Sequence, residues 1–417
     1  MADLIFVAAP VAKPAVVRRR YGHQIPPELA ENPQLKKAMG ALPANYNFEV
    51  VKTLWRIQQS KAKRVALQFP EGLLMYACTL SDIINTFTGA ETVIMGDVTY
   101  GACCVDDLSA RALDCELLVH YGHSCLVPVD TSAIAVLYVF VEIGIDVDHF
   151  VETVRANVPH ASRLALLGTV QFLKAMHAAK PQLAETFAAV GVPQAKPLSP
   201  GETLGCTAPR LKAGEADFMV FLADGRFHPE AAMIHNPEVP LLRYDPYARL
   251  LSREEYDHKQ MLTLREGAVR AARSARCFGL VLGTLGRQGN PQILDHLRAL
   301  LTSLGIPHLV VLLSELFPAK LQMFQGIDAW VQVACPRLSI DWGHGFTVPV
   351  LTPYEAEVAL GARDWQPVYP MSYYAREGGS FANYAIEAER EATRERCCRS
   401  NSRAGGDGSC GDGEPCR

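Results

Sequence analysis

Short apolar runs with the character of β-strands alternate with longer amphipathic stretches along most of the chain. Three of these alternations open in a similar way, at Arg64–Leu73, Leu164–Phe172 and Gly279–Gly289. Each opening has a strand-like run, a polar or glycine-containing turn and a helix-like segment. Because strands that alternate with helices form parallel sheets, the pattern predicts repeated strand–helix modules.

A later strand-like run, preceded by an acidic residue, occurs in each module. These runs are Asp114–His120, Ala216–Leu222 and Ile327–Val333. We therefore expect an α/β protein of three pseudo-repeated small α/β domains with mainly parallel sheets. The expected domains are 46–155, 156–265 and 266–376. A helical insert around 252–276 joins the second domain to the third.

The two ends of the chain depart from this pattern. Residues 1–45 are expected to form an N-terminal extension that several prolines interrupt. Asn47 then predicts the N-cap of a helix that continues to about Lys61. Residues 377–417 are expected to be a charged, disordered tail that includes a helix-prone stretch at 387–399. The tail cysteines lack the tight spacing of a zinc site; they are Cys397, Cys398, Cys410 and Cys416.

The composition is that of an ordinary soluble globular protein, with 49% hydrophobic residues, 20% charged residues and a net charge of −4. This charge gives no electrostatic footprint for a nucleic acid, and the apolar runs are too short to span a membrane. The chain opens with no secretory signal pattern. We therefore expect a cytoplasmic protein, with a nuclear presence left open, that binds neither nucleic acid nor membrane.

The 12 cysteines change this picture. Without a secretory signal, metal binding or catalysis explains them better than a disulfide framework does. Four of them lie in or beside apolar stretches and are expected to be structural; they are Cys78, Cys115, Cys125 and Cys277.

Three cysteines stand in a different setting, on loops that follow strand-like runs: Cys103, Cys206 and Cys335. Ligands bind at the carboxyl ends of strands in open α/β sheets, so these thiols could meet at one metal centre. Their long spacing differs from that of ferredoxin-type ligands. The repeat alone does not predict Cys335, which follows the later strand of its module. Cys104 adjoins Cys103, so one of the two is expected to be packed and the other exposed.

Several segments together carry a resemblance to a known family. They resemble motifs of the enzymes that perform the first step of diphthamide synthesis, and the flanking ends resemble the eukaryotic subunit-one type. The resemblance covers roughly residues 45–375. The segments are Tyr100–Asp107, His120–Cys125, Gly201–Thr207, Gly283–Gly289 and Ala334–Asp341.

The resemblance implies three domains that meet at a central iron–sulfur site, with one cysteine from each domain on a 4Fe-4S cluster. The implied ligands are Cys103, Cys206 and Cys335. Archaeal members have a single cysteine at the first position, which favours Cys103 over Cys104. Thiolates suit iron–sulfur clusters, and three of them leave one iron open for S-adenosylmethionine.

The implied reaction breaks the bond from the sulfur of S-adenosylmethionine to the methionine γ-carbon. The resulting 3-amino-3-carboxypropyl radical adds to C2 of a histidine in elongation factor 2. The implied partners are a related subunit two in a heterodimer, elongation factor 2 as the protein substrate, and a small iron-binding electron donor.

Two kinds of residue are candidates for holding S-adenosylmethionine. Arg287 and Arg337 offer a bidentate fork to its carboxylate, although an arginine at a domain junction can instead bridge acidic side chains. Glycines let a backbone approach a ligand closely. The full candidate set is Gln68, Glu71, Gly283, Gly286, Arg287, Gln288, Gly289 and Arg337.

His120 and His123 are candidate acceptors for the proton that the modified histidine loses from C2. The alternative is that both are hydrogen-bonded structural residues behind a buried strand. Asp106 and Asp107 are expected to cap the helix that follows them.

Two other functions remain open at this point. One is a non-catalytic, cluster-bearing scaffold subunit that supports a partner's catalysis; the full set of three cysteines argues against it. The other is a generic three-domain α/β hydrolase or binding protein, for which the sequence offers no Gly-x-Ser-x-Gly elbow and no Walker loop.

Overall fold

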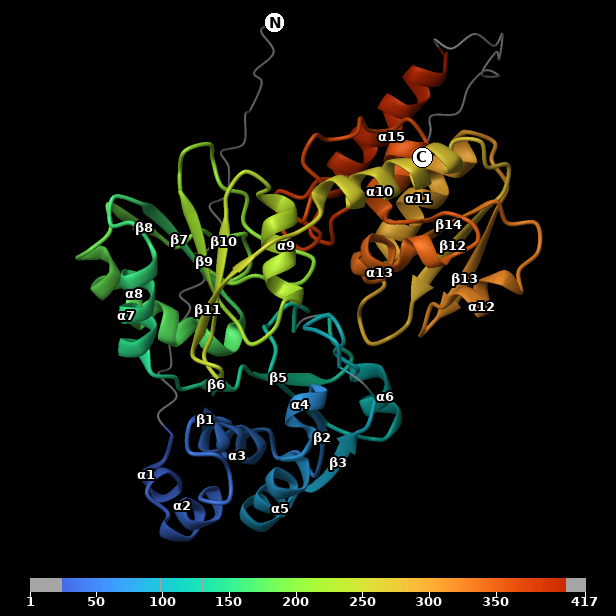
Figure 1. The fold of residues 1–417 in the computed structure, drawn as a ribbon. Helices are drawn as coiled ribbons and strands as arrows, with labels where there is room; N and C mark the ends of the chain where they lie inside the picture. The colour runs from blue at the N-terminus through green and yellow to red at the C-terminus, as the bar shows by residue number, and fades with distance from the viewer. Residues whose placement is uncertain (1–24, 98, 130, 403–417) are drawn as a thin grey trace, which may run out of the picture.

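The computed structural model of the protein describes residues 25–97, 99–129 and 131–402. Three open sheets, each flanked by helices, form three lobes (Figure 1). The first lobe is blue to teal, the second green to yellow and the third yellow to red. The predicted tail cysteines Cys410 and Cys416 lie outside the described residues.

The first sheet has four parallel strands in the order β3-β2-β4-β5. Alternate residues of β2 reach opposite faces, because Val65 and Leu67 pack in one hydrophobic core and Ala66 packs in another. The strands are β2 (Arg64–Gln68), β3 (Glu91–Met95), β4 (Leu117–Tyr121) and β5 (Ala135–Val139). The helices of this lobe are α1 (Pro27–Ala30), α2 (Pro33–Met39), α3 (Val50–Ser60), α4 (Glu71–Leu74), α5 (Ala77–Thr88) and α6 (Asp107–Ala112).

Part of the predicted N-terminal extension packs on this first lobe. Leu29 of α1 and Leu35 of α2 are buried in the same core as α3 and α5. The helix predicted from Asn47 begins later, since Glu49 in a left-handed conformation is the N-cap of α3. Asn47 instead accepts a hydrogen bond from the Glu49 main-chain N–H at 3.0 Å.

The second sheet has five strands in the order β11-β10-β9-β7-β8, parallel except for β11. A short antiparallel pair, β1 (Tyr46–Asn47) with β6 (Glu142–Ile143), lies between the first and second lobes. The strands are β7 (Arg163–Gly168), β8 (Ala189–Gly191), β9 (Phe218–Leu222), β10 (Leu241–Asp245) and β11 (Leu250–Glu254). The helices are α7 (Val147–Asn157), the 3-10 turn η1 (Val170–Phe172), α8 (Leu173–Ala184) and α9 (Phe227–His235).

The third sheet is parallel, in the order β13-β12-β14-β15. Its strands are β12 (Phe278–Gly283), β13 (His308–Leu313), β14 (Ala329–Val333) and β15 (Val350–Leu351). The helices of this lobe are α10 (His258–Ala272), α11 (Pro291–Ser303), α12 (Pro318–Gln322), α13 (Pro336–Trp342), the 3-10 turn η2 (Gly343–Gly345), α14 (Pro353–Ala359) and α15 (Glu387–Ser402).

The three sheets repeat one topology. In each, the first strand along the chain is flanked by the second on one side and by the third on the other, and the fourth strand follows the third. This confirms the predicted pseudo-repeat of parallel α/β units. In the described part of the chain, none of the helices is long and apolar enough to cross a membrane.

Helix α10 packs with the third lobe. Its Arg265 is buried and forms a two-point ion pair with Glu355 of α14, with N–O distances of 2.7 and 2.6 Å. The boundary predicted at residue 265 therefore cuts through a helix that this ion pair ties to α14.

The segment after residue 377 is also folded. Phe381 and Ala382 are buried, and Arg390 of α15 donates a hydrogen bond to Gln292 of α11. The disordered tail predicted from residue 377 therefore begins too early. The sequence does not reveal this folded segment, because most of its residues are polar or charged. A few buried apolar side chains and one buried arginine nevertheless hold the segment against the third lobe.

Candidate metal centre

Three loops bring Cys103, Cys206 and Cys335 together. Cys103 lies between β3 and α6, Cys206 lies between β8 and β9, and Cys335 follows β14 directly as the N-cap of α13. The Cys103 thiol interacts electrostatically with both of the other two thiols. One cysteine from each sheet therefore faces a common centre, although 232 residues separate the first from the last in a 417-residue chain.

Burial makes these thiols hard to ionise by themselves. It raises the pKa of Cys206 to about 12 and that of Cys335 above its usual value. The pKa of Cys103 is raised by its hydrogen bond with Cys104 and by burial. A bound metal stabilises the thiolate form, so metal binding at this centre would release the protons of the thiols.

The donor set consists of soft thiols, which are the usual ligands of iron–sulfur clusters. Among the described residues, no group of three His, Cys, Asp or Glu side chains is arranged to hold one ion. A cluster distributes its ligands over several iron atoms, so its thiolates are spaced more widely. Three soft thiols that face each other from separate domains match that requirement.

The sequence predicts that one cysteine of the neighbouring pair Cys103 and Cys104 is packed and the other exposed. Cys104 is buried, whereas Cys103 is half-buried. The Cys104 sulfur accepts a hydrogen bond from Gln288 Nε2 at 3.4 Å. The hydrogen bond from Cys103 and the main-chain N–H groups of residues 100 and 101 help to lower the Cys104 pKa to about 7. The Cys104 sulfur therefore already has hydrogen-bond donors within the protein, and Cys103 stays the predicted cluster ligand.

The glycine-rich turn after β12 packs against the loop that carries Cys103. Gly286 has φ +54°, and a Cβ built on it would lie 2.4 Å from the carbonyl carbon of Cys104. The Arg287 main-chain N–H donates to the Cys103 carbonyl at 2.8 Å. A Cβ on Gly283 would meet Ala334, the residue before Cys335. These glycines allow close contact between two cysteine loops.

Arg287 joins the same two domains. Its guanidinium makes a bidentate ion pair with Asp107, with N–O distances of 2.8 and 2.7 Å. Burial opposes ionisation of Asp107, but hydrogen bonds from Arg287 and from the Ala133 main-chain N–H hold its pKa below the usual value. The predicted helix cap is Asp106, which accepts from the Ser109 N–H at 3.1 Å. The expectation that Asp107 also caps α6 is wrong, because Arg287 and Ala133 occupy its carboxylate.

Arg337 takes a similar bridging role between the second and third domains. Its Nε lies 2.9 and 2.8 Å from the two carboxylate oxygens of Asp341, and its Nη2 lies 2.5 Å from Glu230. Its Nη1 donates to the carbonyls of Gly205 and Phe227 at 3.2 and 2.8 Å. Because Gly205 precedes Cys206 and Arg337 is near Cys335, this side chain fixes two cysteine loops relative to each other.

His120 is part of β4, the third strand of the first sheet along the chain, and His123 lies on the segment that follows this strand. His120 Nδ1 lies 2.9 Å from Gln68 Oε1, and the two imidazole rings are 5.4 Å apart. His120 Nε2 and His123 Nδ1 find no hydrogen-bond partner among the described residues. Burial lowers both pKa values, that of His123 to about 4. Both rings are therefore neutral near pH 7, and the burial that lowers their pKa also makes them weak bases.

Gln68 and Glu71, predicted together, occupy different environments. Gln68 is buried, and its Nε2 donates to the Cys104 carbonyl at 2.8 Å while its Oε1 faces His120. Glu71 is exposed at the start of α4. The structure thus connects Gln68 with the cysteine loop and leaves Glu71 at the surface.

Two further residues at the centre have no counterpart in the sequence predictions. Tyr374 is buried, and its hydroxyl interacts with the thiols of Cys103, Cys206 and Cys335. Glu202 is buried beside the Cys206 loop and accepts a hydrogen bond from Ser124 of the first domain. Glu202 lies within the motif Gly201–Thr207, but its role, like that of Tyr374, depends on a contact between distant segments.

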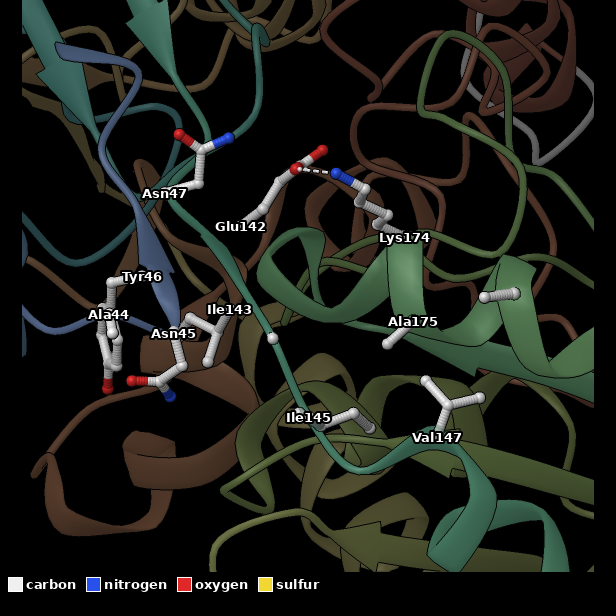
Figure 2. A pocket seen from close by; sticks show the side chains of 12 residues that line it. Ala44, Asn45, Tyr46, Asn47, Glu142, Ile143, Ile145, Val147, Lys174 and Ala175 are labelled. Carbon is white, nitrogen blue, oxygen red and sulfur yellow. Dashed lines mark hydrogen bonds and ion pairs between the residues drawn. The ribbon is translucent and has the colours of Figure 1, made fainter.

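A cavity of about 560 Å³ lies elsewhere, between the β1–β6 pair and α8 (Figure 2). Glu142 of β6 and Lys174 of α8 form an ion pair of 3.0 Å at one side of it. The residues that line this cavity include none of the predicted site residues. It is therefore separate from the cysteine centre.

Comparison with known proteins identifies relatives along most of the chain. A family model described as diphthamide synthesis protein matches residues 69–370. Relatives described as 2-(3-amino-3-carboxypropyl)histidine synthase subunit 1 include the Gallus gallus protein, 58% identical over 89% of this chain and 91% of that relative. The Homo sapiens relative is 58% identical over 88% of this chain and 84% of its own length. For the Schizosaccharomyces pombe relative the identity is 53%, over 85% and 83% respectively.

Solved structures show the same fold. Dph2 from Pyrococcus horikoshii with a 4Fe-4S cluster has a TM-score of 0.65 and 25% identity, and the match covers 78% of this chain and 94% of that chain. A second structure of Dph2 from the same organism has a TM-score of 0.64 and 26% identity, with coverage of 77% and 93%.

Proposed function

The chain belongs to the diphthamide synthesis protein family and to its 2-(3-amino-3-carboxypropyl)histidine synthases, and on this premise we propose how it acts. We propose that it transfers the 3-amino-3-carboxypropyl group of S-adenosylmethionine to C2 of a histidine in elongation factor 2. The reaction is the first step of diphthamide synthesis.

The observation that carries the proposal is the convergence of one cysteine thiol from each of three domains. We assign Cys103, Cys206 and Cys335 as ligands of a 4Fe-4S cluster. Three protein ligands leave one iron available to S-adenosylmethionine. When bound and reduced, the cluster supplies the electron for cleavage of the carbon–sulfur bond in a radical reaction.

The protein's own residues exclude water and position the reacting groups. The cysteine loops are clamped by Arg287 and Arg337, which join the third domain to the first and second domains. Both guanidinium groups are already engaged by carboxylates, so the fork role for the carboxylate of S-adenosylmethionine is less supported than the bridging role. The turn Gly283–Gly289 touches the Cys103 loop, and a ligand beside the cluster would meet its backbone.

His120 and His123 remain the proposed proton acceptors. Their unpartnered ring nitrogens are neutral and buried near the cysteine loop, to which Gln68 connects His120. In the proposed role a free imidazole nitrogen takes the proton that leaves C2 of the modified histidine, although burial weakens both rings as bases.

The proposal includes three protein partners and a location. The description "subunit 1" of the relatives supports a heterodimer with a related subunit two, and diphthamide synthesis supports elongation factor 2 as the substrate. A small iron-binding protein is the proposed electron donor, and the cytoplasm is the proposed location. The eight cysteines whose side chains the structure describes are free thiols, which suits a reducing compartment.

Iron analysis of anaerobically purified heterodimer tests the proposal. We expect about four irons per heterodimer and a paramagnetic resonance signal after reduction. Cys103→Ala, Cys206→Ala and Cys335→Ala should each strip or destabilise the cluster without unfolding the chain, whereas Cys277→Ala, away from the centre, should not. An iron-free wild type would refute the cluster, and full iron content in any of the three variants would refute that ligand. Iron without turnover would favour the scaffold role.

A further inference from the structure

The segment after the third domain returns to the loop that carries Cys206. Thr207 pairs with Ser372 in an antiparallel bridge, and the Ala208 main-chain N–H donates to the Met371 carbonyl at 2.9 Å. A part of the chain more than 160 residues further on therefore forms one wall of the cysteine centre.

Two hydroxyl groups at this junction lie next to cysteine sulfurs. Thr207 Oγ1 donates a hydrogen bond to Cys206 Sγ at 3.8 Å. The same Oγ1 accepts from the Tyr374 main-chain N–H at 2.9 Å, and this bond leaves the hydroxyl hydrogen free to point at the sulfur. The Tyr374 hydroxyl interacts electrostatically with the Cys103 thiol, and burial together with this interaction raises its pKa.

The environment of Tyr374 keeps its hydroxyl at this position. The residue is only 8% exposed and belongs to the hydrophobic core against which Cys103 and Cys206 pack. Its ring lies 6.5 Å from that of Tyr384, whose hydroxyl is fixed by the Leu126 carbonyl. Water therefore competes little with these two hydroxyls for the cysteine sulfurs.

We propose that Thr207 and Tyr374 are positioning residues that raise the reduction potential of the cluster by donating hydrogen bonds to two of its cysteine sulfurs. This inference rests on the proposed function, because it takes Cys103 and Cys206 as cluster ligands. Reduction adds negative charge to the cluster and its sulfurs, and a hydrogen-bond donor stabilises the more negative state more strongly. Loss of either donor makes the cluster harder to reduce.

A redox titration of the anaerobic, iron-loaded heterodimer tests the inference. Paramagnetic resonance gives the ratio of reduced to oxidised cluster at each fixed solution potential, for wild type, Tyr374→Phe and Thr207→Val. We expect each variant to lower this ratio by about threefold to tenfold, the range expected from one ordinary hydrogen bond. The double variant should combine the two effects.

Two matched variants separate hydrogen bonding from packing. Tyr373→Phe removes a neighbouring buried hydroxyl that lies 3.4 Å from the Tyr369 hydroxyl, and it should leave the ratio unchanged. Thr207→Ser keeps the donor and should behave like wild type. Comparison of Thr207→Val with Thr207→Ser therefore tests the inference even if Tyr374→Phe fails to retain iron.

The outcomes distinguish this inference from the proposed function. A wild-type protein without iron refutes the cluster itself. Iron-loaded variants with an unchanged ratio refute the role of the hydroxyls and leave the cluster intact. An equal change in Tyr373→Phe, or in Thr207→Ser, also refutes it, because packing alone would then explain the effect.

Discussion

At the scale of single residues, the conformation of the first cysteine loop depends on a glycine of the third domain. Gly286 combines a left-handed backbone with a contact that leaves no space for a side chain beside Cys104. L-amino acids with a Cβ are strained in this backbone region, by about 1–2 kcal/mol. The backbone strain and the close contact both arise where the turn Gly283–Gly289 packs against the loop that carries Cys103.

Gly286→Ala should therefore displace the Cys103 loop and reduce both stability and iron binding. We expect a loss of about 2–4 kcal/mol in the free energy of unfolding, from backbone strain and overpacking together. Urea unfolding and iron analysis measure the two effects. Gly267→Ala in α10 is the matched control, because the added Cβ would meet nothing within 4 Å among the described residues apart from its chain neighbours and the helix's own backbone. Normal iron content in Gly286→Ala would show that the loop tolerates displacement.

Asp107 and Arg287 show why some site predictions could not be completed from sequence. The motif residues are visible, but the sequence leaves open whether Arg287 binds a ligand or bridges acidic side chains. Its partner lies 180 positions earlier in the chain. Only the three-dimensional arrangement of the domains decides between the two roles, and here it favours the bridge.

Asp107→Asn should weaken this bridge in a pH-dependent way. At pH 7 we expect a loss of about 1–3 kcal/mol in the free energy of unfolding, the usual cost of an unpaired buried polar group. The folded-state pKa of Asp107 lies below its usual value of 3.8, so the ionised carboxylate stabilises the fold above that pH. The difference between wild type and variant should therefore shrink as the pH falls below about 4.

Urea unfolding at pH 7, 5 and 3.5 measures this difference. Asp295→Asn, which removes an exposed partner of Arg298, is the control and should change stability by less than about 1 kcal/mol. If the Asp107→Asn effect stayed constant down to pH 3.5, the ionised carboxylate would not be its source.

At the scale of elements, periodicity predicts strands well and chain ends poorly. Apolar runs such as Arg64–Gln68 and Phe218–Leu222 become central strands, because a strand covered on both faces needs a nearly continuous apolar sequence. The region after residue 377 is polar on average, yet Phe381 is buried against Tyr354 and Tyr373. Average composition does not show such isolated anchor residues.

Two truncations test the division of the C-terminal region. A chain that ends at Ser400 should keep its stability, iron content and activity, because it retains Phe381, Tyr384 and Arg390. A chain that ends at Gly378 loses the buried Phe381 and Arg390 and the half-buried Tyr384. It should lose several kcal/mol of stability, since removal of one buried phenylalanine side chain alone costs about 3–5 kcal/mol. Thermal unfolding and iron analysis compare the two chains.

The opposite results would revise the picture in different ways. Lost activity with normal stability in the longer truncation would show that the last residues bind a partner. Normal stability in the shorter chain would show that the segment 379–400 only covers a body that folds without it.

At the scale of the whole molecule, three lobes with one topology meet through their loops. A continuous hydrophobic core joins the second and third lobes, and Ala102 and Leu126 of the first lobe also belong to it. Sequence repeats predict the lobes but not this junction, because the repeat does not specify which loops face each other. Cys335 illustrates the point: it occupies a different loop of its module from Cys103 and Cys206 and still reaches the same centre.

Because the proposed cluster binds one cysteine from each lobe, iron should stabilise the whole assembly and not one domain. Binding to the folded state alone adds stability that grows with the ratio of free ligand to its dissociation constant, by about 2.7 kcal/mol at a hundredfold excess. Each kcal/mol corresponds to about 2–4 °C in Tm for domains of 150–250 residues. Removal of iron from wild type should therefore lower Tm by several degrees, as measured by anaerobic calorimetry.

Cys335→Ala provides the matched comparison, because it removes a ligand from the third lobe alone. Without iron, the variant and wild type should unfold at nearly the same temperature, and adding iron and sulfide should raise only the wild type. If iron loading shifted the unfolding of one lobe and left the others unchanged, the cluster would belong to a single domain. A single cooperative shift would instead mean that the three loops are held together by one metal centre.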